Sequence, residues 1–108
     1  MKYKIVVIPG DGIGPEVVAQ GLKVLNAIGQ RYGHYFDLDH RLAGAASIDV
    51  FGVPLAPEVV EACRQSDGVL FGAVGDPRFD GAPLQERPER GIIELREQLG
   101  LFVDLRFA

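Results

Sequence analysis

The sequence predicts an α/β fold in which a mostly parallel sheet is flanked by helices. Continuous apolar runs at residues 3–9 and 68–72 have the length and composition of buried strands. Apolar residues at helical spacing fill residues 15–32 and 57–64, so strands and helices alternate along the chain. The 108 residues contain no internal repeat and no linker, which indicates one domain or part of one.

The turn after the first strand holds glycine at three alternate positions, 10, 12 and 14, followed by Pro15. Glycine permits positive φ and close backbone approach, and proline is favoured at the first helical position, so we expect a tight strand-to-helix turn. The turn is not the G-x-G-x-x-G dinucleotide fingerprint, because Pro15 or Val17 stands where the third glycine should be. A turn that binds a ligand and a turn that only connects two elements both fit these residues.

The helix expected at residues 15–32 carries a wide apolar stripe, which we expect to pack on the sheet. The stripe consists of Val18, Leu22, Leu25 and Gly29, with Val17, Gly21, Val24 and Ile28 beside them. A second strand is expected at residues 35–42, with Phe36 and Leu38 on one side. A short helix follows at 44–51 and ends at Gly52, before the helix at 57–64 and the strand at 68–72.

Residues 73–88 are predicted to be a loop, because three prolines and two glycines interrupt every regular pattern there. Structureless loops of this length are usually functional. Ligands of parallel sheets bind beyond the carboxyl ends of the strands, and both this loop and the 10–14 turn leave strands at that end. We therefore expect the two segments to border one site. A helix at 89–99 and an alternating strand at 101–106 complete the predicted fold.

Composition argues against several classes of function. The net charge of -4 argues against nucleic acid as a partner. No apolar run reaches the roughly 20 residues of a membrane helix, and the N-terminus lacks the layout of a signal peptide, which favours a cytoplasmic protein. The single cysteine, Cys63, lies in a helical apolar pattern and is expected to be a buried structural thiol. His34 and His40 have no partners at zinc-ligand spacing.

Four segments together resemble one protein family. They are Pro-Gly-Asp-Gly-Ile-Gly-Pro-Glu at 9–16, Gly-Ala-Ala-Ser-Ile-Asp at 44–49, Gly-Ala-Val-Gly at 72–75 with Pro77 after it, and Arg-Pro-Glu at 87–89 leading to Leu-Arg at 95–96 and 105–106. In these residues the chain resembles the isocitrate and isopropylmalate dehydrogenases, a family of decarboxylating β-hydroxyacid dehydrogenases. It is most similar to the isopropylmalate branch. The resemblance implies a two-part α/β fold unlike the usual Rossmann fold.

The resemblance also implies a reaction and its cofactors. It implies NAD-dependent oxidation of the 2-hydroxyl group of 3-isopropylmalate, a step of leucine biosynthesis. Loss of a carboxylate, assisted by Mg²⁺ or Mn²⁺, then gives 4-methyl-2-oxopentanoate. The family works as homodimers, with substrate and cofactor in a cleft between the two parts of the fold. Tartrate or malate dehydrogenases and isocitrate dehydrogenase share the malate-binding core and are the alternatives within the family.

Substrate-binding residues follow from the matching positions. Arg96 and Arg106 are expected to hold the malate carboxylates, and Ile92 is expected to form the apolar wall beside the isopropyl group. Each charge-assisted contact contributes about 1.5–3 kcal/mol. An apolar residue at 92 argues against isocitrate, whose extra carboxylate would be left unpaired. The alternatives are core packing for Ile92 and, for the two arginines, ordinary surface pairs with Glu89, Glu94 or Asp104.

Cofactor contacts are expected from three parts of the chain. Ile13 and Glu89 match positions near the nicotinamide. The loop matches positions that contact the cofactor at Asp76, Pro77, Arg78, Phe79 and Asp80. For Phe79, anchoring of the loop onto the body of the protein is an equally open alternative.

The chain departs from the family pattern near residue 108. Phe107 stands where the family has proline, and Asp104 stands where asparagine is usual. Family members continue far beyond this point, and we expect the metal ligands, the proton-transfer residues, a third arginine and the adenosine pocket there. We therefore expect an N-terminal enzyme segment that is inactive and poorly stable alone. A non-catalytic module that binds carboxylates or nucleotides is the alternative.

Overall fold

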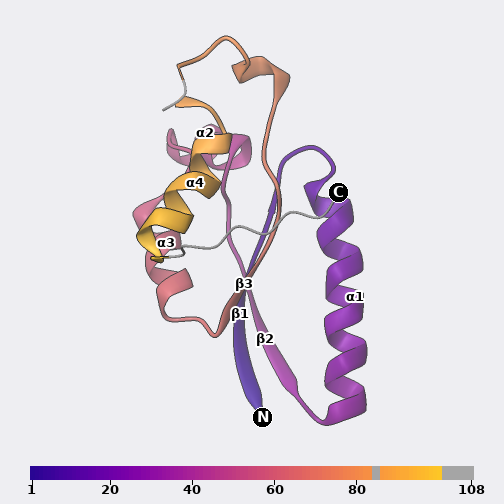
Figure 1. Ribbon diagram of the computed structural model, residues 1–108. Coiled ribbons are helices and arrows are strands. Elements are labelled where there is room, and N and C mark those ends of the chain that lie inside the picture. The colour runs from indigo at the N-terminus through magenta and orange to yellow at the C-terminus, as the bar shows by residue number, and fades with distance from the viewer. Residues whose placement is uncertain (84–85, 101–108) are drawn as a thin grey trace.

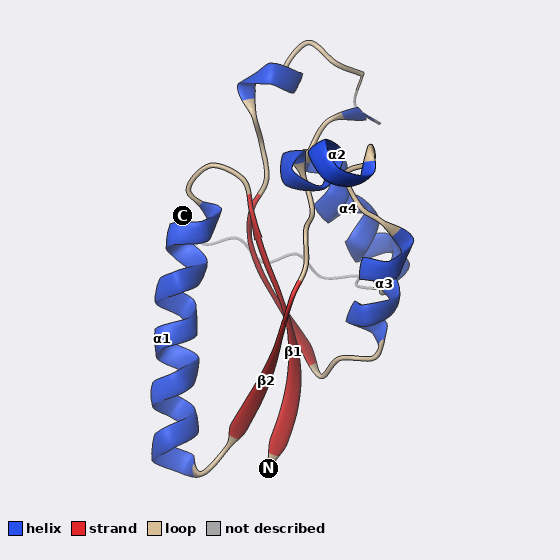
Figure 2. Ribbon diagram, turned by 180° about the vertical axis from the view of Figure 1, so that it is seen from behind, coloured by secondary structure: helices blue, strands red, loops and turns tan. Residues whose placement is uncertain are grey.

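The computed structural model describes residues 1–83 and 86–100 and shows a parallel three-stranded sheet between helices (Figure 1). Helix α1 lies on one side of the sheet, and α2, α3 and α4 lie on the other (Figures 1 and 2). The strand order is β2-β1-β3, which confirms the predicted fold class. The strand predicted at 101–106 lies outside the described residues. In chain order the elements are β1 (Lys2–Gly10), α1 (Gly14–Tyr32), β2 (Tyr35–His40), α2 (Ala45–Phe51), α3 (Pro57–Arg64), β3 (Gly68–Ala73), the 3-10 helix η1 (Pro77–Phe79) and α4 (Glu89–Gln98).

Strand β1 is the centre of the sheet and of the core. It pairs with β2 along residues 2–7 and with β3 along residues 5–10. Val6, Val7 and Ile8 have no exposed surface. Because successive side chains of a strand point to opposite faces, Val6 and Ile8 join the core formed with α3 and α4, and Val7 points to the α1 side. The continuous apolar run predicted a strand buried on both faces, and β1 confirms it.

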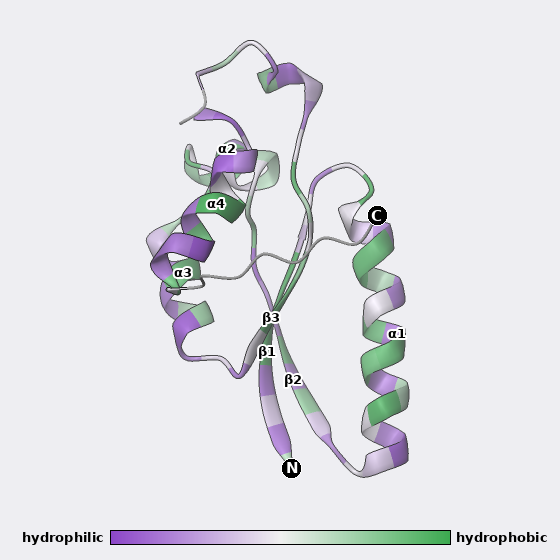
Figure 3. Cartoon of the chain, viewed as in Figure 1, coloured by the Kyte–Doolittle hydropathy of each residue, from purple (hydrophilic) through white to green (hydrophobic). Residues whose placement is uncertain are grey.

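Helix α1 packs on the sheet through a narrower stripe than the sequence predicts. Val18 and Gly29 are buried, and the Cα of Gly21 faces the side chain of Leu70 in β3. The sheet is only three strands wide, so the neighbouring row of the helix has nothing among the described residues to cover it. The exposed fractions of that row are 54% for Val17, 60% for Val24 and 40% for Ile28. The prediction is therefore wrong for this row, and Figure 3 shows the apolar stretches along the helix.

The remaining elements lie close to their predicted bounds, with two differences. β2 ends at His40 rather than at residue 42: the last hydrogen bond to β1 runs from the Arg41 N–H to the Val7 carbonyl (2.9 Å), and the chain then turns toward α2. Residues 73–88 are not a structureless loop, because β3 extends to Ala73 and η1 occupies residues 77–79. The Asp76 carboxylate begins η1 by accepting the Arg78 N–H (2.9 Å).

Helices α3 and α4 cover the second face of the sheet. Leu55, Val59 and Leu95 pack with Val6 and Ile8 in the core cluster. Cys63 of α3 is 4% exposed, which confirms the buried thiol, and burial raises its pKa. Among the described residues, no helix combines the length and apolarity needed to cross a membrane.

Candidate functional site

The carboxyl ends of β1 and β3 are joined directly at one edge of the sheet. Gly10 pairs with Ala73, and the Asp11 N–H donates a hydrogen bond to the Ala73 carbonyl oxygen (2.6 Å). Gly10 has a φ of 80°, and a Cβ at this position would overlap the Ala73 carbonyl, so glycine is required. The 10–14 turn and the segment after β3 therefore meet on one rim, as the sequence predicts.

The Asp11 carboxylate joins three segments at this rim. Its Oδ2 accepts the backbone N–H groups of Ala45 (2.7 Å) and Gly75 (3.1 Å), and its Oδ1 accepts that of Ala46 (3.0 Å). Sequence reasoning assigned no role to Asp11, although the residue stands inside the first motif. The only signal in the sequence is an acidic residue inside a glycine-rich turn, and it does not indicate which distant backbone N–H groups the carboxylate accepts.

The segment predicted to contact the cofactor is tied to α2 by one arginine. The guanidinium of Arg78 lies 2.9 Å from the Asp76 carboxylate and 3.2 Å from the Asp49 carboxylate of α2. It also lies 5.3 Å from the centre of the Phe79 ring. Hydrogen bonds from Arg78 lower the pKa of the Asp76 carboxyl, and the two carboxylates raise the pKa of Arg78. Pro77 and Asp80, at the ends of this short turn, are exposed.

Phe79 lines a pocket of about 340 Å³ between this segment and α2. The pocket wall on the α2 side includes Ile48 and Pro54. Both roles considered for Phe79, contact with the cofactor and anchoring of the segment, stay predictions. Ile13, at the start of α1, is 66% exposed and is free of core packing.

Helix α4 places three predicted site residues on one face. Glu89, Ile92 and Arg96 are three and four positions apart, the spacing that aligns side chains along a helix. Glu89 lies beside Gly75, since its Oε1 would be 3.2 Å from a Cβ built there. Ile92 and Arg96 line one pocket of about 150 Å³. Its other walls come from β3 and the far end of α4, at Val69, Phe71, Leu95 and Leu99.

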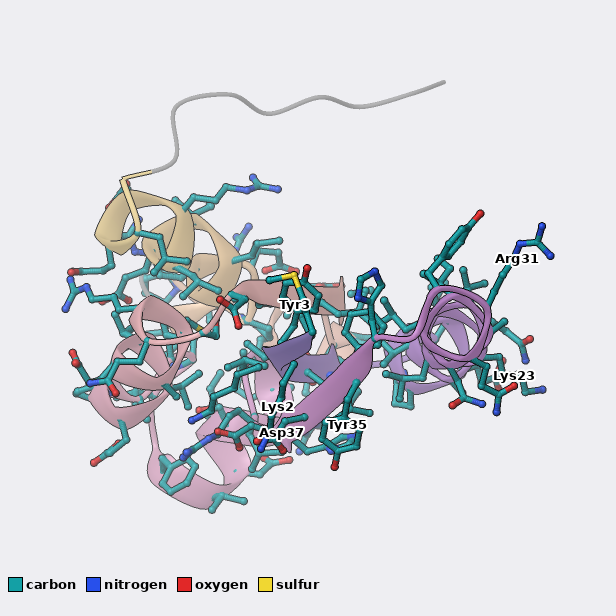
Figure 4. The ribbon with its side chains drawn as sticks, turned by 90° about the horizontal axis from the view of Figure 1, so that it is seen from below. Lys2, Tyr3, Lys23, Arg31, Tyr35 and Asp37 are labelled. Carbon is teal, nitrogen blue, oxygen red and sulfur yellow. The ribbon has the colours of Figure 1, made fainter. Side chains whose placement is uncertain are left out.

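The structure thus brings Ile92 and Arg96 together and places Glu89 beside Gly75, just before the segment predicted to contact the cofactor. Arg106 lies outside the described residues, so the pairing of the two arginines stays a prediction. The amino ends of β1 and β2 form the opposite edge of the sheet, where Figure 4 shows Lys2 beside Tyr35. The Nζ of Lys2 lies 5.7 Å from the centre of that ring.

The described residues offer no site for a metal ion, but they offer surfaces that a dinucleotide can contact. Within residues 1–83 and 86–100, no three His, Cys, Asp or Glu side chains gather as a divalent ion requires. No step involving a metal is therefore assigned to these residues. The rim offers a dinucleotide an exposed apolar side chain at Ile13 and a segment held by Arg78.

The sequence was compared with protein-family profiles and with curated proteins, and both comparisons give the same family. The profile of the isocitrate/isopropylmalate dehydrogenase family matches residues 4–108. Over 106 residues the chain is 53% identical to a 3-isopropylmalate dehydrogenase of Dehalococcoides mccartyi, covering 98% of this chain and 29% of the relative. It is also 53% identical to a 3-isopropylmalate dehydrogenase of Nitratidesulfovibrio vulgaris, covering 98% of this chain and 30% of that protein. The chain spans about 29% of the length of such relatives.

Solved structures agree with the sequence comparison. A β-decarboxylating dehydrogenase from Thermococcus kodakarensis, in its apo form, superposes with a TM-score of 0.73 at 39% identity, over 93% of this chain and 27% of that one. An isocitrate dehydrogenase from Methylococcus capsulatus gives a TM-score of 0.61 at 35% identity, over 69% of this chain and 21% of that one. By its sequence and its fold, the chain belongs to the isocitrate/isopropylmalate dehydrogenase family.

Proposed function

We propose that this chain supplies one wall of the active cleft of an NAD-dependent 3-isopropylmalate dehydrogenase of leucine biosynthesis. The observation that carries the proposal is the pocket shared by Ile92 and Arg96, in which an aliphatic side chain and a guanidinium stand one helical turn apart. A substrate with a branched alkyl group next to carboxylates requires this combination. The 3-isopropylmalate dehydrogenases among the relatives support the same substrate.

In this proposal each of the predicted site residues has a separate task. Arg96 pairs with a malate carboxylate, because a guanidinium presents parallel N–H donors to two oxygens. Ile92 contacts the isopropyl group and excludes water from it. Glu89 stands beside the nicotinamide, where bound NAD would supply the acceptor for the hydride of the substrate's C2. Ile13 and residues 76–80 hold the cofactor in place.

The rest of the catalytic machinery belongs to a longer enzyme in this proposal. We propose a cytoplasmic homodimer that uses Mg²⁺ or Mn²⁺, with Arg106 as the second arginine of the substrate site. The 108 residues alone are expected to lack dehydrogenase activity, because the described residues do not gather a metal site.

A related family activity is the second candidate. The observation in favour of isocitrate as the substrate is the similarity of the fold to that of an isocitrate dehydrogenase. Isocitrate, however, would place a third carboxylate against Ile92, and burying an unpaired charge on an aliphatic wall is costly. Tartrate and malate have no alkyl branch to contact the apolar half of the pocket. A binding module without catalysis likewise gives no reason for an apolar surface beside Arg96.

A hybrid enzyme tests the proposal. In the hybrid, the 106 matched residues of the Dehalococcoides mccartyi relative are replaced by those of this chain, and NADH formation is measured with isopropylmalate, malate and isocitrate. We expect isopropylmalate to have the highest kcat/KM. A hybrid that has the parent's circular dichroism and melting temperature but prefers isocitrate, or oxidises none of the three, overturns the proposal.

A second measurement addresses the natural protein. An antibody raised against residues 1–108 captures it from its native cells, and its intact mass is recorded. A mass well above that of 108 residues is expected from the proposed enzyme. A mass equal to that of 108 residues supports the binding module instead.

A further inference from the structure

Every polar group of Asp11 is engaged in holding another part of the rim. Its N–H donates to Ala73, its carbonyl accepts the Gly14 N–H (2.8 Å), and its carboxylate accepts three further backbone N–H groups. Those three donors are 34, 35 and 64 residues away in the sequence, at Ala45, Ala46 and Gly75. One carboxylate therefore fixes segments that the chain itself leaves far apart.

The space around the carboxylate is closely filled. Gly44 has a φ of 75°, and a Cβ there would overlap both the Oδ2 of Asp11 and the side chain of Val74. The segments before α2 and after β3 therefore approach the same oxygen from two sides. Hydrogen bonds from backbone N–H groups to an ionised carboxylate are about twice as strong as neutral ones.

The segment at 76–80 depends on Asp11 twice. Its start is held directly through the Gly75 N–H. Its middle is held through α2, because Arg78 pairs with Asp49 and Phe79 shares a pocket with Ile48. The first turn of α2 is itself bound to the Asp11 carboxylate. The 10–14 turn, α2 and the 76–80 segment thus form one closed circuit of contacts.

We infer that Asp11 is a positioning residue whose carboxylate sets the place of the 76–80 segment against the 10–14 turn, and thereby the affinity for the dinucleotide. The effect on cofactor affinity rests on the proposed function. The contact network around Asp11 does not depend on it. In this inference Asp11 holds the residues that touch the cofactor, and its own hydrogen bonds go to the protein backbone.

Amide hydrogen exchange on the hybrid enzyme, recorded without substrate or cofactor, tests the network without any activity assay. Asp11→Asn keeps one acceptor oxygen, and Asp11→Ala keeps none. We expect exchange at Ala45, Ala46 and Gly75 to accelerate by about tenfold or more in Asp11→Ala and by less in Asp11→Asn. Formate has the size of the missing carboxylate and is expected to restore protection in Asp11→Ala. The matched control is Asp37→Asn, on the edge strand β2 (Figure 4). It is expected to leave exchange at these three amides unchanged.

Kinetics of the hybrid enzyme test the consequence. We expect Asp11→Asn to raise the KM for NAD by about tenfold, while the KM for isopropylmalate changes by less than about threefold. A residue that only supported folding would lower the active fraction, and so kcat, without this difference between the two KM values. Formate is expected to lower the KM for NAD in the Asp11→Ala hybrid.

The outcomes separate the two proposals. Unchanged protection at Gly75 in Asp11→Ala overturns the network. Loss of protection at all three amides with an unchanged KM for NAD overturns the link to the cofactor, and the hybrid's preference for isopropylmalate then still supports the proposed function. An unsubstituted hybrid that is folded but inactive overturns the proposed function, while amide exchange still decides whether Asp11 holds Gly75.

Discussion

Ile92 and Arg96 lie one turn apart on α4 and face the same pocket, which Val69 and Phe71 of β3 close from the sheet side. Arg96 thus borders a pocket whose other lining residues are all apolar. Such a pocket distinguishes substrates by their alkyl group, because each methylene that it buries contributes about 1–3 kcal/mol to discrimination.

Replacing Ile92 by serine tests the apolar wall. In the hybrid enzyme, Ile92→Ser is expected to lower kcat/KM for isopropylmalate by about 10-fold to 200-fold and to leave that for malate within about threefold. Steady-state kinetics with both substrates give the ratio of the kcat/KM for isopropylmalate to that for malate. Ile92→Val serves as the conservative control. Equal losses on both substrates contradict the pocket assignment.

Arg96→Lys tests bidentate binding of a carboxylate. Lysine keeps the charge but not the planar fork, so the KM for isopropylmalate is expected to rise by roughly 10-fold or more at an unchanged KM for NAD. Arg90, which is on the same helix and pairs with Glu97, is the matched control as Arg90→Lys. Unchanged substrate affinity in Arg96→Lys contradicts the assigned role.

The ion pair of Asp76 and Arg78 predicts how the rim responds to acid. The pKa of Asp76 is lowered by Arg78, so the pair stabilises the folded chain above the ordinary aspartate value of about 3.9. This stabilisation is lost as the pH falls through the lower, folded value. An NMR titration of the Asp76 carboxyl carbon is expected to show a midpoint below that of the same carboxyl in Arg78→Gln. Added salt is expected to reduce the difference, because the pair is exposed.

Cys63 reports on opening of the core between α3 and the sheet. Burial raises the pKa of its thiol, so little thiolate forms at neutral pH. We expect a disulfide reagent to label the native chain at least about 100-fold more slowly than the chain in urea. The signal is unambiguous because Cys63 is the only cysteine. Equally fast labelling in the two conditions contradicts a packed core at α3.

Exposed apolar residues predict self-association of the isolated 108-residue chain. Val24 on α1 is 60% exposed, and Phe51 on α2 is 54% exposed. Sedimentation velocity is expected to show larger species as the concentration rises, and Val24→Lys is expected to increase the monomer fraction. Gln20→Lys adds the same charge at an exposed polar position of the same helix and should change little. Cooperative unfolding of a monomer at micromolar concentration is the contrary result.

Local signals in the sequence predicted the elements that local chemistry determines. The helix at 57–64 was placed correctly, because Pro57 has a fixed φ and no N–H group and so favours a helix start. The α2 helix ends before Gly52, as the glycine indicated. Strand β1 was evident because a buried central strand needs an unbroken apolar run.

Contacts between distant segments were beyond the reach of the same signals. Arg78 and Asp49 are 29 residues apart, and their pairing depends on where α2 sits relative to the end of β3. The role of Asp11 depends on backbone N–H groups, which every residue except proline carries and which therefore leave no mark in a sequence. The apolar row of α1 at Val24 has the pattern of a buried face, and helical spacing alone cannot show which row a narrow sheet covers.

The close approach of Gly10 to Ala73 has a consequence for protein engineering. The glycines that make this turn conspicuous accommodate another strand's backbone, so Gly10→Ala is expected to be a folding defect that carries no information about ligand binding. A mutant library aimed at ligand contacts would therefore waste its diversity at residue 10. Under the proposed function, such a library belongs at the exposed positions of the 76–80 segment, where side chains vary without separating two strands.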